Sequence, residues 1–493
     1  MHVAALREQI AVAPLPSPAP AAESSAIVRL LTCGSVDDGK STLIGRMLWD
    51  ATSIAEDQRA AIIHASQNRL QNGEKVDFSL LLDGLQAERE QGITIDIAWR
   101  YFETTHRRFV VIDAPGHEQY TRNMATGASH ADVAILLVDA RHGVKRQTRR
   151  HAAICDLVGI KSVVLAVNKM DLIDYSEATF RAIEAEFRSL AQSFNFCIVA
   201  IPVAALPGDN VVRSSSAMPW YGGPTLLDHL ETLDVDTERR DAPFRMPVQL
   251  VLRHGDFRGY AGTVASGHIR PGDRIVDAGS GLGATVRRIT TMDGNLTFAH
   301  KGDAVAVELD TDLDISRGAV LSEVQRRPIN ADVLEARLVW LAEAPFDPEA
   351  GYLLRTATDL TPVTSMSVSA LIDFETLAST PAHACAANDI ADCRILLGRP
   401  TSLDLFADLP ATGNFILVSA VDGTTVAGGV ISWAQAGAAT VGDNVFVLDR
   451  ELLLRGLCSD LGDSPADLAE FHRRAQEAAI LLRSVGIPVL IEI

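Results

Sequence analysis

The chain has 493 residues, of which 47% are hydrophobic and 22% are charged. A single core rarely grows that large, so about three or four domains are expected, and the balanced composition excludes wholesale disorder and a fibrous repeat. The formal net charge of −19 argues against a broad grip on RNA or DNA, because nonspecific phosphate binding depends on clustered lysines and arginines.

The N-terminal segment and the cysteine pattern indicate the compartment. Residues 1–25 are rich in Ala and Pro and lack a basic start followed by an apolar run, which favours a flexible tail over a secretory signal. No stretch reaches the roughly 18–20 unbroken apolar residues that crossing a bilayer requires. The six cysteines are scattered without a regular framework, as is typical of reduced thiols. We therefore expect a soluble, cytoplasmic protein without membrane association.

The first large segment, residues 26–241, alternates short β-branched runs with longer helical stretches. The runs that we expect to form strands are 27–32, 109–112, 133–139 and 162–168. This alternation predicts an α/β domain with a mostly parallel sheet and helices on both faces.

The rest of the chain divides into four further parts. In residues 242–327 and 328–432, short runs are separated by Gly, Pro and Asp, which predicts two antiparallel β-barrel domains. A Gly/Ala-rich linker is expected at 433–442. Residues 443–493 have αβ character, with predicted strands at 444–448 and 487–493 and a predicted helix at 468–484 that 464–467 could cap.

A phosphate-binding pattern, G-x-x-x-x-G-K-[ST], follows the first predicted strand and directly precedes a predicted helical stretch that begins at Thr42. The glycines let backbone N–H groups wrap the β-phosphate, Lys40 neutralises the β and γ oxygens, and the Ser41 hydroxyl is expected to ligate Mg²⁺. A Gly-rich turn without this role is the alternative. The pattern comprises Gly34, Ser35, Val36, Asp37, Asp38, Gly39, Lys40 and Ser41.

A second motif, Asp113-Ala114-Pro115-Gly116-His117, follows another buried strand. Asp113 is expected to face the metal and hold a Mg²⁺-bound water, and the Gly116 amide can sense the γ-phosphate. His117 is expected to orient the attacking water, although a histidine at this position can also simply pack.

A third motif, Asn168-Lys169-Met170-Asp171, follows a third strand. An aspartate carboxylate accepts two hydrogen bonds from guanine N1–H and the 2-amino group, which adenine does not offer. At about 1.5–3 kcal/mol for each bond to a charged group, this favours guanine at least tenfold. Each of the last two motifs is weak alone, but the three in this order predict a P-loop GTPase domain.

The remaining hydrolytic candidate is Thr94, in the sequence Gly92-Ile93-Thr94-Ile95. It lies between the phosphate loop and Asp113, where GTPases place a switch threonine that closes over Mg²⁺ and the γ-phosphate. A strand threonine without a role is the alternative.

These motifs resemble the translation-factor class of GTPases, such as elongation factor Tu, which has a GTP-binding domain followed by two β-barrels. Within that class the chain is most similar to the GTPase subunit of sulfate adenylyltransferase, and the similarity spans roughly residues 27–431. The stretches that carry it are 82–96, 117–129, 208–212, 218–221, 257–262, 314–318 and 412–416.

The resemblance implies a partnership. Family members bind a smaller subunit that forms adenylyl sulfate and pyrophosphate from ATP and sulfate, and GTP hydrolysis drives this uphill reaction. We therefore expect GTP and Mg²⁺ as cofactors, and a heterodimer or higher assembly with a small adenylyl-transferring subunit. No nucleic-acid partner is expected.

Two departures from the family matter. Where the family carries Ser-Ala-Leu, this chain has Ala204-Ala205-Leu206, so the guanine O6 contact is left to the backbone N–H groups of Ala205 and Leu206. The segment 443–493 is similar to the middle of adenylyl-sulfate kinase, yet no second phosphate loop precedes it. We read it as a remnant without kinase activity.

Two other functions stay open. A translation factor that positions RNA is opposed by the branch-specific stretches and by the acidic balance. A GTP-dependent assembly switch without a metabolic role is the third reading.

Overall fold

The computed structural model describes residues 27–51, 56–67, 76–81, 96–234, 242–255 and 257–436, and in the C-terminal part 446–449, 453, 467, 470–471, 473–475, 478 and 489–492. The chain separates into two compact units, Met1–Gln435 and Ala436–Ile493. The expected tail at 1–25 and most of the expected linker at 433–442 lie outside the described residues.

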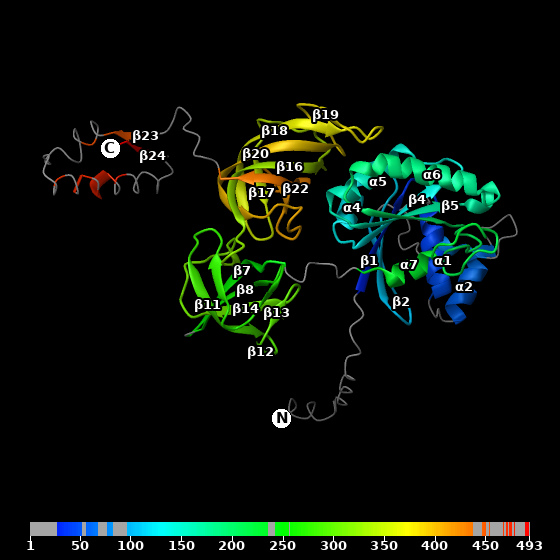
Figure 1. Ribbon diagram of the computed structural model, residues 1–493, viewed down its shortest axis with the longest axis horizontal. Helices are drawn as coiled ribbons and strands as arrows, with labels where there is room; N and C mark the ends of the chain where they lie inside the picture. The colour runs from blue at the N-terminus through cyan, green and yellow to red at the C-terminus, as the bar shows by residue number, and fades with distance from the viewer. Residues whose placement is uncertain are drawn as a thin grey trace, which may run out of the picture. The chain divides into compact units, whose positions relative to one another are not determined.

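A six-stranded sheet with the strand order β2-β3-β1-β4-β5-β6 forms the first domain (Figure 1). All neighbours are parallel except β2 and β3, which are antiparallel. The central strand β4 is buried along its whole length, as a run of Val, Ala, Ile and Leu requires when both faces are covered. The strands are β1 (Ile27–Gly34), β2 (Ala98–Glu103), β3 (Arg108–Asp113), β4 (Val133–Asp139), β5 (Ser162–Asn168) and β6 (Cys197–Pro202).

Helices cover both faces of this sheet. Apolar residues of α4, α5 and α6 pack in one core cluster with one face, and those of α1 and α7 pack with the other. The expectation of a mostly parallel sheet with helices on both faces is confirmed. The helices are α1 (Lys40–Ala51), α2 (Glu56–Gln67), α4 (Thr121–Ala128), α5 (Arg146–Leu157), α6 (Glu177–Leu190) and α7 (Leu226–Thr232), with 3₁₀ turns η1 (Phe78–Leu81), η2 (Glu118–Tyr120), η3 (Met170–Ile173) and η4 (Ala191–Ser193).

A closed antiparallel barrel follows the first domain. Its strand order is β10-β15-β7-β8-β14-β11-β12, and the additional pairing of β10 with β11 closes the ring. Alternate side chains fill its core. The strands are β7 (Arg245–His254), β8 (Phe257–Thr263), β10 (Arg274–Asp277), β11 (Gly283–Thr291), β12 (Gly294–Leu296), β14 (Ala304–Leu309) and β15 (Val320–Glu323), with β9 (His268–Ile269) and β13 (Ala299–His300) paired beside it.

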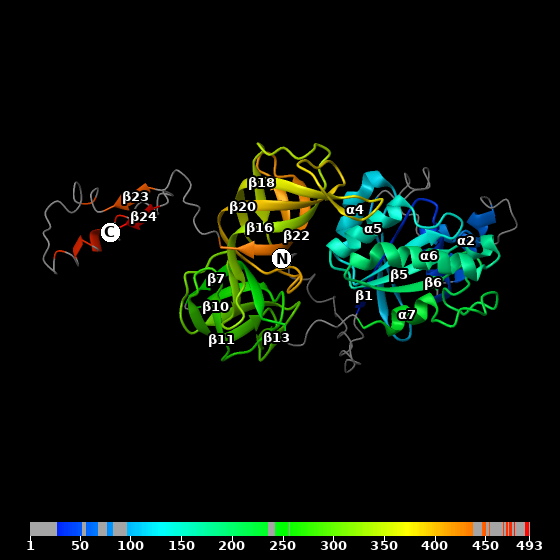
Figure 2. The ribbon, with the colours of Figure 1, turned by 45° about the horizontal axis from the view of Figure 1, so that its top comes forward.

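The next barrel is built in the same way (Figure 2). Its order is β17-β21-β22-β16-β20-β18-β19, and the pairing of β17 with β18 closes it around the fully buried Trp340. Two barrels after the α/β domain confirm the predicted fold class. The strands are β16 (Ile329–Trp340), β17 (Tyr352–Arg355), β18 (Leu360–Ile372), β19 (Ser379–Pro381), β20 (Ile390–Leu403), β21 (Asn414–Ser419) and β22 (Thr425–Gln435).

The C-terminal unit contains a parallel pair of strands, β23 (Phe446–Asp449) and β24 (Val489–Glu492). Both overlap the ranges predicted as strands. Phe471 and Ala475, which lie in the range predicted as a helix, are helical and buried. Across the described residues, no helix has the length and apolarity needed to cross a membrane.

Candidate functional site: the loops at the carboxyl edge of the sheet

The predicted motifs meet at one edge of the six-stranded sheet. Parallel pairing places Thr32 opposite Asp113 and Asp139 opposite Asn168, so the segments that follow β1, β3, β4 and β5 leave the sheet side by side. Ligands of open α/β sheets bind outside the carboxyl ends of the strands. This edge is therefore the candidate nucleotide site.

The phosphate loop folds around its own lysine. Lys40, at the start of α1, is 8% exposed, and its Nζ donates to the carbonyl oxygens of Gly34 at 3.0 Å and Ser35 at 2.9 Å. Burial lowers the pKa of Lys40 from its usual value, while Asp113 and Asp38 act in the opposite direction. A Cβ on Gly116 would lie 2.7 Å from the carbonyl oxygen of Gly34 and would also collide with Lys40 Nζ, so glycine is what lets the second motif approach this loop.

Asp113, the carboxylate predicted to face the metal, lies at the end of β3. It is 3% exposed, and its Oδ1 accepts a hydrogen bond of 3.0 Å from Thr32 Oγ1. Mg²⁺ prefers oxygen ligands and usually takes one or two carboxylates together with substrate phosphates. The Asp113 carboxylate and the Ser41 hydroxyl fit that donor set. Thr94 lies outside the described residues.

Within the part of the chain that the structure describes, no group of three or more His, Cys, Asp or Glu side chains could hold an ion. A divalent cation at Asp113 would share its coordination with a bound phosphate, as Mg²⁺ does in nucleotide sites.

The third motif is bonded to the phosphate loop. Asn168 Nδ2 donates to the Asp38 carbonyl at 2.9 Å, and Asn168 Oδ1 accepts from the Ala205 amide at 3.0 Å. Lys169 has a left-handed backbone with φ of +63°, and its Nζ donates to the carbonyl of Asp37. These bonds connect three loops: the phosphate loop, the third motif and the loop that follows β6.

The expected base-recognition groups lie beside this junction. Asp171, in η3, is half-buried, and burial raises the pKa of its carboxyl, with Asp209 acting in the same direction. Hydrogen bonds from guanine would compensate for that loss of solvent. The Ala205 amide, one of the two amides expected to contact guanine O6, donates instead to Asn168 Oδ1, and the other expected amide is that of Leu206.

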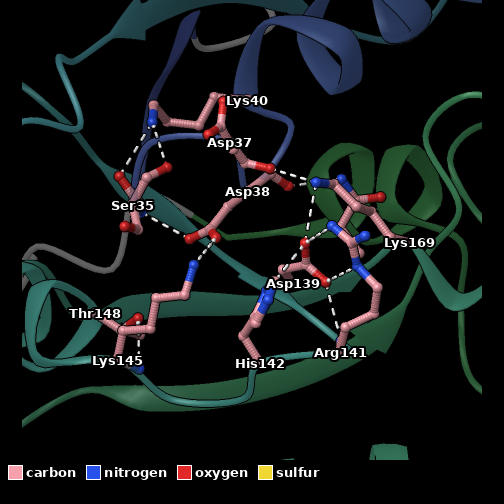
Figure 3. Close-up of polar contacts among 12 residues, drawn as sticks. Ser35, Asp37, Asp38, Lys40, Asp139, Arg141, His142, Lys145, Thr148 and Lys169 are labelled. Carbon is pink, nitrogen blue, oxygen red and sulfur yellow. Dashed lines mark hydrogen bonds and ion pairs between the residues drawn. The ribbon is translucent and has the colours of Figure 1, made fainter. Parts of the chain in front are cut away.

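Sequence reasoning missed a fourth loop, which follows β4 (Figure 3). Asp139 is 2% exposed, accepts from the Arg141 amide and guanidinium at 2.7–3.1 Å, and forms an ion pair of 3.0 Å with Lys169. These partners keep the pKa of Asp139 well below its usual range despite burial. Lys145 Nζ donates to Asp38 Oδ1 at 3.1 Å. One sequence signal could have identified this loop: Asp139 stands at the end of a buried strand, as Asp113 does.

The expected hydrolytic histidine is at the surface. His117 is exposed, its Nδ1 accepts from the Gln119 amide at 3.5 Å, and its ring centroid lies 6.1 Å from that of Tyr120. The side chain therefore does not pack in the core, which was the alternative.

The remaining predicted residues belong to the same loops and differ in exposure. The buried ones are Ala114, Pro115, Met170 and Ala204, the half-buried ones are Val36, Ser41 and Thr42, and Asp37 is exposed.

Two protein-family models match parts of this chain. The model of the elongation factor Tu GTP-binding domain matches residues 25–251, and that of the GTP-eEF1A C-terminal domain-like family matches residues 333–432.

Relatives extend over most of the chain. "Sulfate adenylyltransferase subunit 1" of Colwellia psychrerythraea is 48% identical and covers 84% of this chain and 89% of its own length. The protein of the same name from Aeromonas salmonicida is 46% identical over 88% and 93%. "Bifunctional enzyme NodQ" of Rhizobium tropici is 43% identical over 94% of this chain and 81% of its own length.

Proposed function

We propose that this chain, which belongs to the translation-factor-type GTPase family of sulfate adenylyltransferase subunit 1, binds and hydrolyses GTP to drive sulfate activation by a partner subunit. One observation supports the GTP site most directly. Asn168 and Lys169, from the guanine motif, are hydrogen-bonded to the backbone of the phosphate loop. These hydrogen bonds support a site in which base recognition and phosphate binding are joined.

Each residue of the site has a defined task in this proposal. Lys40 gives up the carbonyls of Gly34 and Ser35 for the β and γ oxygens, because a charged acceptor binds an ammonium more strongly than a neutral one. Ser41, Thr94 and, through a water, Asp113 are the residues that would hold Mg²⁺, and the ion would neutralise charge on the phosphates.

Hydrolysis requires a water aligned with the γ-phosphate. His117 follows Gly116, whose close approach to Lys40 brings this segment to the phosphate loop. The exposed imidazole can turn toward that water and orient it. The Gly116 amide then reports whether a γ-phosphate is present.

Guanine selection rests on Asp171 and the Leu206 amide. The carboxylate accepts from N1–H and the 2-amino group, and the amide donates to O6. Ala204 replaces the serine of the family and so lacks its hydroxyl, but the proposed contact of the Leu206 amide does not depend on that side chain.

The partner is a small subunit that forms adenylyl sulfate and pyrophosphate from ATP and sulfate. The test is pyrophosphate release from ATP and sulfate by that subunit plus this chain, with GTP, with a non-hydrolysable GTP analogue, and with no guanine nucleotide. We expect pyrophosphate release to be stimulated in the mixture with GTP and not in the other two. Equal flux in all three mixtures, at matched protein concentrations, would reject the coupling role.

The chain alone should make no adenylyl sulfate and should not phosphorylate it. The phosphate-loop pattern occurs once in these 493 residues, at Gly34 to Ser41, and we assign that loop to GTP. The NodQ relatives are named as bifunctional, so the second half of this expectation needs its own assay. Radiolabel transfer from ATP to adenylyl sulfate by the purified chain would show that the C-terminal unit retains kinase activity.

A further inference from the structure

A buried carboxylate lies within the loop that would receive a triphosphate. Asp38 is 1% exposed, and its Oδ2 accepts a hydrogen bond of 2.7 Å from the Ser35 amide. This bond fixes the turn of the phosphate loop. The negative charge that makes the bond strong also opposes the phosphates, because two like charges inside a protein repel more strongly than in water.

Lys145 compensates for this charge from another loop. Its Nζ lies 3.1 Å from Asp38 Oδ1, and its side chain is 34% exposed. Asp38 therefore has both carboxylate oxygens occupied, one by the backbone amide of Ser35 and the other by an ammonium (Figure 3).

The backbone of Lys145 is fixed independently of Asp38. Its amide donates to Thr148 Oγ1 at 3.3 Å at the start of α5, and Thr148 is fully buried. The amides of His142 and Gly143 donate to the Asp139 carbonyl at 3.0 Å each, which closes the turn after β4. The ammonium thus reaches the phosphate loop from a rigid base.

We propose that Lys145 is a positioning residue for the nucleotide: it neutralises Asp38 so that the buried carboxylate can shape the phosphate loop without repelling the triphosphate. This inference rests on the proposed GTP site. It adds the loop between β4 and α5 to the elements on which GTP affinity depends.

A double-mutant cycle tests it. The dissociation constant for GTP with Mg²⁺ is measured for the full chain carrying Lys145→Met, Asp38→Asn or both. Asparagine keeps an oxygen for the Ser35 amide and removes the charge. We expect Lys145→Met to weaken binding about tenfold when Asp38 is present, since a buried charge left unpaired is costly but Lys145 is partly exposed.

The same Lys145→Met change should weaken binding less than twofold in the Asp38→Asn background. Arg146→Met is the matched control, because it removes a positive charge one residue along the chain and its partner is Glu375 rather than the phosphate loop. Thermal unfolding without nucleotide reports whether each variant is folded.

Two results would overturn the inference. One is an unchanged GTP affinity in Lys145→Met. The other is an equal loss in both backgrounds, which would indicate a structural role for Lys145 in α5 instead of charge compensation. Failure of the proposed function looks different, because the unmodified chain would then bind no GTP in the same titration, and the inference would fall with it.

Discussion

Replacement of Gly39 by alanine tests whether the phosphate loop and the guanine motif form one unit. Gly39 has φ of +93°, a conformation that side chains rarely adopt, and a Cβ there would lie 2.5 Å from Asn168 Nδ2. The new methyl group must displace Asn168. Both of its hydrogen bonds, to the Asp38 carbonyl and from the Ala205 amide, are then lost or lengthened.

The expected cost follows from these contacts. The strained backbone costs about 1–2 kcal/mol, and two hydrogen bonds contribute about 1 kcal/mol each. The sum is about 3–4 kcal/mol. If GTP binds only to the assembled junction, Gly39→Ala should weaken GTP binding by up to roughly several hundredfold, at about 1.4 kcal/mol per factor of ten.

The assay is a GTP titration with Mg²⁺, and Gly302→Ala is its control. Gly302 has the same φ of +93°, but a Cβ there would meet nothing within 4 Å. The control therefore carries the backbone strain without the collision and should bind GTP normally. A dissociation constant for Gly39→Ala within threefold of the unmodified value would refute the coupling of the two loops through Asn168.

Three further predictions concern single side chains. Asp171→Asn should favour xanthine over guanine nucleotides in competition binding, since an amide donates where the carboxylate accepted; a persisting preference for GTP would exclude Asp171 as the base contact. His117→Ala should lower single-turnover GTP hydrolysis and leave GTP affinity nearly intact, because water orientation acts in the transition state; an unchanged rate would point to another residue. Burial, with Lys40 and Arg150 nearby, lowers the pKa of His151 from 6.5 to about 3. Between pH 6.5 and about 3 the His151 imidazole is therefore protonated only in the unfolded chain. The free energy of unfolding should fall as the pH drops through this range, by up to about 1.4 kcal/mol per pH unit. His151→Gln should reduce this slope, and a pH profile of the variant parallel to that of the unmodified chain would count against the assignment.

Local patterns explain why the sheet and the three motifs could be predicted. A run such as Val133 to Asp139 is apolar throughout because both faces of a parallel sheet are covered, and this signal needs no knowledge of the partner strands. The glycines and the lysine of the phosphate loop are likewise read from eight consecutive residues. Their placement at one edge follows from parallel pairing alone.

Contacts between loops could not be predicted in this way. Lys145 and Asp38 are 107 positions apart, and their meeting depends on β1 and β4 being neighbours with a particular register. The bond from the Ala205 amide to Asn168 depends similarly on how the chain turns after β6. Composition and spacing carry no information on either, so one of the two amides expected to contact O6 proved to have another partner.

The bonds of Asn168 and Lys169 also limit what mutations in the guanine motif can reveal. Removing either side chain breaks contacts with the phosphate loop as well as any contact with the base, so lost GTP binding would not distinguish recognition from loop assembly. Asp171 differs, because the hydrogen bonds and ion pairs described between the loops run through Asn168, Lys169, Asp139 and Lys145. A change in base preference at Asp171, with the phosphate loop intact, therefore measures guanine recognition itself.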